Sequence, residues 1–568
     1  MLRISFEAAD DGFDPIKSVN LYSNWVGDAI YERLLGYDYV ARPAKLVPMT
    51  AKAMPQVSSD GKTFVFDLKP GIHFSPDPAF KGKRRELTAQ DYVYSIKRIL
   101  DPANRSPMAN FVEGKIVGLD ALAQAAKKSG RYDYDAPVAG LRAEGRYTLR
   151  IVLNKPDHNF LFVVASGALG AVAREVIEAH GLQSALHPVG TGPYLLAQYV
   201  PRSKIVLAAN PEYRGFTWNF QSGGSPDDDA LVRTMQGKTM PQIGKVDISI
   251  IDEQQSRWLA FQDQQLDLDM LPQAVAPRVL DGNRLKKEFL DKGIAVSRYV
   301  EPEINYTFFN FRDPTVGGYT PDKIALRRAI AMSYSIADEI AQYQMGQAVK
   351  AEMIIPPGVI GHDPQYRSSI PYDVALANAL LDKFGYKRGA DGMRTLSDGK
   401  PLLIKLRTEA NAKDKIRAEV WKRGLDRIGV RVEFSTSNFA DNTKESNECK
   451  LMMRGAAWLP DIPDGENFLQ LLYGRNALQG NYGCYQSPTY DALYREALSL
   501  PLGPQRTALY AKMARQFEAD TPWVLATSRI RTWMMQPWVQ GFKKHPVLQS
   551  TWQYMDIDLA ERARRAHK

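Results

Sequence analysis

Alternating apolar and polar residues mark strands along the chain. In residues 64–68, two phenylalanines and a leucine fall on one face and the intervening residues on the other, which is the period of a half-buried strand. Similar patterns predict strands at residues 147–153, 205–207, 246–250, 306–310, 402–406 and 430–434. The sequence therefore predicts β-structure in both halves of the chain.

Helix signals stand between these strands. Thr88 lies three residues before Asp91, a capping-box-like start for a helix that runs to about residue 100. Thr320 and Pro321 form an N-cap and first turn, and we expect one long helix from there to about residue 344. A further helix, with apolar residues at 416, 420, 425 and 428, leads into the strand at 430–434.

Strands interleaved with helices in two successive blocks predict α/β lobes. Between the blocks, residues 216–240 are rich in glycine and aspartate, and we expect a polar surface loop or insertion there. The chain has 568 residues, more than one hydrophobic core usually organises, so we expect two or three lobes.

Charge and composition exclude several classes of protein. The chain is 44% hydrophobic and 24% charged, as in ordinary globular proteins. Its net charge is +9, and its lysines and arginines are scattered among 64 acidic residues. The chain has no long basic run and no recognisable nucleic-acid-binding module. We therefore expect no nucleic-acid partner.

The apolar segments and the cysteines bear on the cellular compartment in which the protein works. The longest apolar run, residues 160–173, covers about 14 residues against the roughly 18 needed to span a membrane. The N-terminus has no apolar signal core, so the protein is either cytosolic or has lost a signal peptide. Cys449 and Cys484 are the two cysteines; they form either one disulfide or two buried thiols.

Familiar catalytic motifs are incomplete. Gly-Lys-Thr occurs at residues 61–63 and 237–239, but Gln56 and Val232 stand where a phosphate-binding loop needs its first glycine. The seven histidines form no zincin pair, and no nucleophile elbow surrounds a serine. We expect a protein that is not an enzyme and has no cofactor or metal; the alternative is a catalytic site built from residues far apart in the sequence.

Two blocks carry a family resemblance. Residues 59–74 (SDGKTFVFDLKPGIHF) and 87–98 (LTAQDYVYSIKR) closely resemble a hallmark of the large substrate-binding proteins of bacterial ABC importers, the oligopeptide- and dipeptide-binding family (solute-binding family 5). Further similar segments occur in the family's order at residues 13–15, 30–34, 190–194, 210–213, 326–330, 458–461 and 490–493. The resemblance spans about residues 10–545. Segments 75–85 and 216–240 depart from the family pattern and put a plain peptide ligand in doubt.

The resemblance implies an α/β fold of the periplasmic-binding-protein type (class II, cluster C), with two lobes, a hinge and an extra domain. Lobe I would comprise residues 1–50, 186–300 and 521–568, the extra domain II residues 51–185, and lobe III residues 301–520. Hinge segments are expected near residues 299–309 and 523–527, because closure around a ligand is an established switching mode of such proteins.

The implied function is that of a monomeric periplasmic protein that captures a peptide or a similar amine-bearing solute between its lobes and delivers it to an ABC permease. One alternative keeps this role with another ligand: a metal chelate, haem, an opine, a sugar or a bile-type molecule. A secreted hydrolase and a folding chaperone are alternatives of other classes.

Five residues are carried over as candidate ligand contacts. Asp461 stands three residues after Trp458, the spacing with which peptide-binding relatives hold the ligand's ammonium group; alternatively it caps a turn. Trp458 would line the pocket or belong to the core, and Ala457 would lie on a strand that bonds the ligand backbone. Tyr22, in the ligand-facing segment 18–22, is equally a surface or core aromatic. Arg407 would hold a ligand carboxylate or be a solvated strand-end arginine.

Overall fold

The computed structural model describes residues 1–566 and divides into two compact units. The first comprises Met1–Ser297 and the C-terminal segment that begins at Thr532, and the second is Arg298–Arg531. The chain passes between the units within β16 (Ala295–Val300) and within β22 (Trp523–Met535). The division of the first unit into lobe I and domain II stays a prediction.

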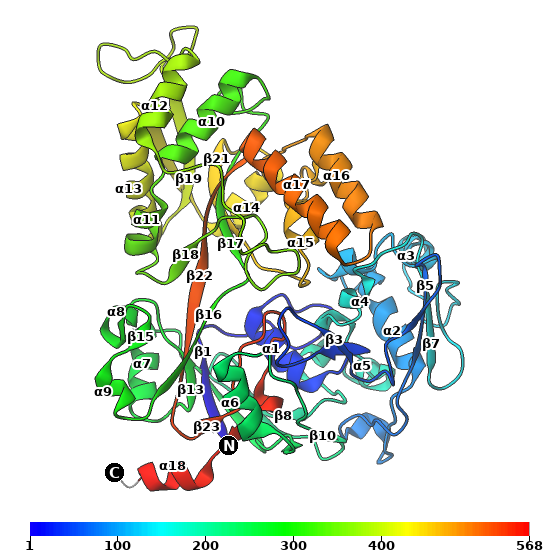
Figure 1. The fold of residues 1–568 in the computed structure, drawn as a ribbon. Coiled ribbons are helices and arrows are strands. Elements are labelled where there is room, and N and C mark those ends of the chain that lie inside the picture. Colours follow the sequence, from blue (N-terminus) through cyan, green and yellow to red (C-terminus); the bar gives the residue numbers. More distant parts are fainter. Residues whose placement is uncertain (567–568) are drawn as a thin grey trace. The chain divides into compact units, whose positions relative to one another are not determined.

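Two four-stranded sheets organise the first unit (Figure 1). One has the order β1 (Leu2–Phe6), β12 (Lys245–Ile250), β9 (Lys204–Ala209), β8 (Tyr194–Val200), with β1 parallel to β12 and the other pairs antiparallel. The other is antiparallel, with the order β4 (Gln56–Val57), β5 (Thr63–Asp67), β7 (Thr148–Val152), β6 (Leu141–Ala143).

Local sequence explains the second of these sheets. Phe64 and Phe66 of β5 are buried, as the alternation predicts. Helix α2 (Ala89–Leu100) packs on β6 and β7 and begins with the predicted capping box, in which the backbone N–H of Thr88 donates to Asp91 Oδ2 at 2.7 Å. Such a cap satisfies backbone donors that the first helical turn leaves unpaired.

One mixed sheet runs through the second unit, in the order β22, β17 (Ile304–Phe309), β21 (Met453–Trp458), β19 (Leu403–Glu409), β20 (Arg431–Ser437). The parallel strands β19 and β20 are joined by α13 (Ala412–Arg427), which is a βαβ unit. Helices α10 (Pro321–Ser333) and α12 (Val374–Lys383) enclose one hydrophobic core with α13. Helices α16 (Pro488–Ser499) and α17 (Pro504–Asp520) lie side by side and enclose another (Figure 1).

The predicted helix from Thr320 to about residue 344 is wrong in length. α10 ends at Ser333, and Tyr334 is extended (φ −82°, ψ 117°). The chain then continues as α11 (Ile336–Asp338), capped by Ser335, and a π-helical turn, η5 (Glu339–Tyr343). Tyr334 is buried against the ring of Trp421 at 4.1 Å between centroids, so core packing interrupts the helix.

The expected polar loop at residues 216–240 is also incorrect, while its interpretation as an insertion stays a prediction. It contains β10 (Phe216–Thr217), α6 (Pro226–Met235) and β11 (Thr239–Met240). Ser225 caps α6 by accepting a hydrogen bond from the N–H of Asp228, and Pro226 opens the helix. Trp218 is fully buried and donates its indole N–H to the carbonyl of Tyr554 at 3.2 Å, so the segment is folded structure.

Cys449 and Cys484 form a disulfide, with their Cα atoms 6.1 Å apart. This settles the choice between a bridge and two thiols.

Among the helices of the described residues, none combines the length and the apolar character needed to cross a membrane.

Removing the disulfide should destabilise the second unit. The bridge closes a loop with a sequence separation of 35 residues, and in the chain-entropy model this is worth about 3–4 kcal/mol. We expect the Cys449→Ala/Cys484→Ala variant to lose about that much free energy of unfolding of this unit, measured by urea unfolding. The reduced wild-type protein is the matched comparison, and equal unfolding midpoints for the oxidised and reduced forms would contradict the prediction.

Candidate ligand-binding site

The candidate site is built on strand β21. β21 pairs along its whole length with β17, from Met453 opposite Phe309 to Trp458 opposite Ile304. On its other edge it pairs with β19 only through Met453 and Arg454. Within the described part of the chain, no strand pairs with the second edge of residues 455–458. These residues therefore offer backbone donors and acceptors to an added strand.

Ala457 and Trp458 lie at the end of this free edge. Ala457 is exposed, and Trp458 is half-buried, with its ring against the core that α16 and α17 enclose. The indole N–H of Trp458 donates to Asn467 Oδ1 at 2.9 Å. The tryptophan thus contributes to the core while standing at the end of the free edge.

Asn467 also holds Asp461. Its Oδ1 accepts the backbone N–H of Asp461 at 3.1 Å, and its Nδ2 donates to Asp461 Oδ2 at 3.4 Å. Asn467 belongs to α15 (Glu466–Leu469) and is buried. One amide side chain therefore fixes Trp458 and Asp461 relative to each other, a role that no local sequence signal indicated.

The loop after Asp461 is anchored by a buried ion pair. Arg506 Nη2 donates to Asp464 Oδ1 at 2.9 Å, and both side chains are almost fully buried. The Tyr510 hydroxyl donates to the same oxygen at 2.6 Å. Residues 463 and 465 form backbone hydrogen bonds with Ile360. These contacts hold the loop in place before any ligand arrives.

Asp461 is exposed to solvent and makes no ion pair among the described residues. Protein atoms around its carboxyl nevertheless remove part of its hydration and raise its pKa above the ordinary value, while the hydrogen bond from Asn467 opposes that rise. The residue thus touches water, while its carboxyl lies among protein atoms. A carboxylate in such surroundings favours a cationic partner.

Arg417 approaches the same strand at Gly455. A Cβ added at Gly455 would lie 3.0 Å from the guanidinium carbon of Arg417, so the absence of a side chain lets the arginine pack against the strand. Arg417 also donates to Asp414 Oδ1 at 3.0 Å, and its guanidinium lies 5.0 Å from the centre of the Tyr343 ring. No local sequence pattern indicated this arginine.

Arg407 and Tyr22 already have partners. Arg407 donates to Ser435 Oγ at 2.9 Å and to Asn442 Oδ1 at 3.1 Å, and pairs with Glu445 at 2.9 Å. Tyr22, on α1 (Leu21–Ile30) of the first unit, packs against Phe6 and Trp25 with ring centroids 4.7 and 5.6 Å apart. Their expected ligand contacts stay predictions.

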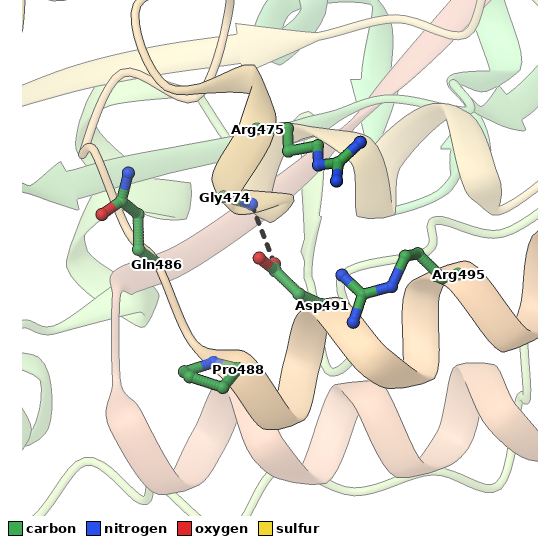
Figure 2. Close-up of a pocket in the computed structure, with 6 residues that line it drawn as sticks. All are labelled: Gly474, Arg475, Gln486, Pro488, Asp491 and Arg495. Atoms are coloured by element: carbon green, nitrogen blue, oxygen red, sulfur yellow. Dashed lines mark hydrogen bonds between the residues drawn. The ribbon is translucent and has the colours of Figure 1, made fainter.

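A separate pocket of about 460 Å³ lies where α16 begins. Its walls are formed by Gly474, Arg475, Gln486, Pro488, Asp491 and Arg495. Asp491 Oδ1 accepts the N–H of Gly474 at 2.9 Å, and Figure 2 shows Gln486 on the side opposite the two arginines. None of the sequence-predicted contacts lines this pocket, so it is distinct from the β21 site.

Solved structures with this fold include periplasmic binding proteins. A solved structure with a similar fold is the periplasmic binding protein DppA from Helicobacter pylori in complex with the peptide STSA, at a TM-score of 0.71 and 21% identity over 98% of each chain. The model of the bacterial extracellular solute-binding proteins, family 5, matches residues 45–479. The chain belongs to this family, as the sequence blocks indicated.

Two curated relatives are similar over most of their length. Heme-binding protein A of Haemophilus influenzae is 24% identical over 542 residues, covering 94% of this chain and 88% of the relative. Periplasmic oligopeptide-binding protein OppA of Escherichia coli is 24% identical over 560 residues, covering 95% and 89%. The names of these two relatives refer to different ligands, haem and oligopeptides.

Replacing Asn467 tests the support of the site. Asn467→Ala leaves the indole N–H of Trp458 and the backbone N–H of Asp461 without their acceptor, which costs about 1–3 kcal/mol for each group that stays buried. We expect a lower free energy of unfolding of the second unit by urea, and a changed Trp458 fluorescence, obtained by subtracting the spectrum of the Trp458→Phe variant. Asn467→Asp keeps an acceptor and should be milder; equal effects of the two variants would refute the assigned role.

Proposed function

We propose that this protein captures a peptide, or an amine-bearing solute of similar size, on the free edge of β21 and delivers it to an ABC permease from outside the cytoplasm. The observation that carries the proposal is the unpaired edge of residues 455–458, followed by an aspartate that has no cationic partner among the described residues. Binding, rather than catalysis, is the proposed activity.

The edge would recognise the ligand through its backbone. Four residues of a strand extend about 13 Å at about 3.3 Å per residue, which suits a ligand of roughly two to four amino-acid residues. Hydrogen bonds to a peptide backbone give affinity with little side-chain specificity. Ala457 would take part through its backbone, which explains why a small, exposed residue suffices there.

The two ends of the ligand would meet opposite charges. Asp461 would bind an ammonium group, and its raised pKa reflects the desolvation of its carboxyl by surrounding protein atoms. Arg417, which packs against Gly455, would favour a carboxylate at the other end. A free zwitterionic peptide has both groups, which is why we prefer it to a ligand with one sign of charge.

A non-peptide ligand is the second candidate, and the name of the haem-binding relative supports it. Mass spectrometry of small molecules released by denaturing the purified protein distinguishes the two. A series of masses that differ by amino-acid residues supports a peptide. A single non-peptide mass would keep the proposed importer role but contradict the proposal that the ligand is a peptide.

Closure of lobes about hinges, capture in the periplasm and a monomeric state belong to the same proposal.

Neutralising Asp461 should weaken peptide binding. A charge-assisted hydrogen bond contributes about 1.5–3 kcal/mol, so we expect Asp461→Asn to raise the dissociation constant of a matching peptide about 10- to 150-fold, measured by calorimetry. Asp398→Asn, at an exposed residue paired with Lys400, is the control. With an N-acetylated peptide, Asp461→Asn and wild type should bind alike; an equal loss for both peptides would place the ammonium elsewhere.

Acidification should weaken binding of the free-amine peptide. The ammonium requires ionised Asp461, and the pKa of this group in the unliganded protein is raised. The affinity for the free-amine peptide is therefore highest above that pKa and falls as the pH drops through it. The fall begins at a higher pH than it would for an ordinary aspartate. The measurement is the dissociation constant against pH for free and N-acetylated peptides. A pH dependence that is unchanged in Asp461→Asn would show that another group is responsible.

A further inference from the structure

A buried carboxylate and two imidazoles meet in the first unit, apart from the elements that form the β21 site. Asp77 lies in the segment 75–85, which departs from the family pattern, and its side chain is 2% exposed. It caps the short helix η1 (Pro78–Phe80), where its Oδ1 accepts the N–H of Ala79 at 2.8 Å. This contact leaves further lone pairs on the carboxylate.

The two imidazoles come from consecutive short elements. His180 ends α5 (Arg174–His180), and His187 follows η4 (Gly181–Leu186). Gly181, with φ +52°, turns the chain between them. The two rings stack with centroids 3.9 Å apart and an interplanar angle of 23°. Both side chains are partly exposed, at 28% and 42%.

Both histidines direct Nε2 towards Asp77. The Nε2 atom of His187 lies 2.6 Å from Asp77 Oδ2, and that of His180 lies 3.9 Å from Oδ1. One hydrogen bond accounts for the position of His187. At 3.9 Å, His180 is beyond hydrogen-bond distance, so a hydrogen bond to Asp77 does not explain why a second imidazole faces the same carboxylate.

We propose that Asp77, His180 and His187 bind a divalent transition-metal ion of the Zn²⁺ type. One atom from each residue can be chosen so that all three lie within 4.8 Å of one another. Two imidazole nitrogens and one carboxylate oxygen are a ligand set that Zn²⁺ uses. With three protein ligands, a fourth position stays open to water or to a small anion.

The adjustment needed for binding is small. Zn²⁺ bonds of about 2.0–2.1 Å in tetrahedral geometry place the ligand atoms about 3.3 Å apart, between the 2.6 and 3.9 Å observed. The metal must lie near the plane of each ring, so the stacked imidazoles have to splay apart. The buried Asp77 can remain fixed while the two more exposed rings turn.

Binding would join parts of the chain that are distant in sequence. Asp77 and His187 are 110 residues apart, and the metal would tie the segment 75–85 to α5 and η4. An ion that binds the folded protein in preference to the unfolded chain raises its stability with concentration. The site is therefore expected to act as a clamp within the first unit, independently of any ligand at β21.

The test is a titration of the untagged protein with Zn²⁺, followed by calorimetry and by thermal unfolding. We expect one ion per chain and a rise in the melting temperature of the first unit. Asp77→Asn keeps a side-chain oxygen that can cap η1 but removes the charge, and should weaken binding at least 10-fold; His180→Gln and His187→Gln should do the same. His158→Gln, a histidine of the same unit outside the cluster, should bind as wild type does.

A spectroscopic measurement keeps the proposal testable if one variant folds poorly. Co²⁺ in place of Zn²⁺ should give the visible absorption of a four-coordinate site with nitrogen and oxygen ligands, and Zn²⁺ should displace it. The proposal is overturned if the wild-type protein binds no Zn²⁺. It is equally overturned if the three variants bind like wild type, or if His158→Gln loses binding to the same extent, because the ion would then sit elsewhere or adhere nonspecifically.

Discussion

The second unit depends on β17, a strand paired on both edges and packed on both faces. β22 and β21 bind its two edges. Ile304, Tyr306 and Phe308 enter one core, and Phe309 enters the other. Tyr306 stacks on Trp523 of β22 at 3.8 Å between ring centroids. With one edge of β21 fixed by β17, the other edge can stay open beyond Arg454 without loss of the strand.

The local patterns were sufficient to predict much of the fold. The alternation in β5 and the capping box of α2 depend on residues close in sequence, and both were confirmed. The family blocks gave the fold class for the same reason, since each block is a contiguous segment. The helix after Thr320 was predicted too long because the break at Tyr334 comes from its burial against Trp421, on another helix. In residues 216–240 the capping signal Ser225-Pro226 was present but was read as part of a loop.

Only those residues of the candidate site that lie close together in the sequence could be predicted. Trp458 and Asp461 were found by their separation, and whether they contact a ligand stays a prediction. Asn467 and Arg417 were missed because their contacts depend on how a loop and a helix return to β21. The cluster of Asp77, His180 and His187 is likewise assembled by the tertiary fold and has no local spacing that would indicate it. The expectation of no metal stays a prediction.

The disulfide makes the strength of one junction in the second unit depend on the redox state of its surroundings. Disulfides form in oxidising compartments and are rare in the reducing cytosol, so the freshly made polypeptide lacks the bond between Cys449 and Cys484. Cys449 lies just before β21, and the carbonyl of this residue accepts a hydrogen bond from Asn310, just after β17. Before oxidation this junction is held by noncovalent contacts alone. The reduced chain is then easier to keep unfolded, and the covalent bond secures the junction only once the surroundings are oxidising.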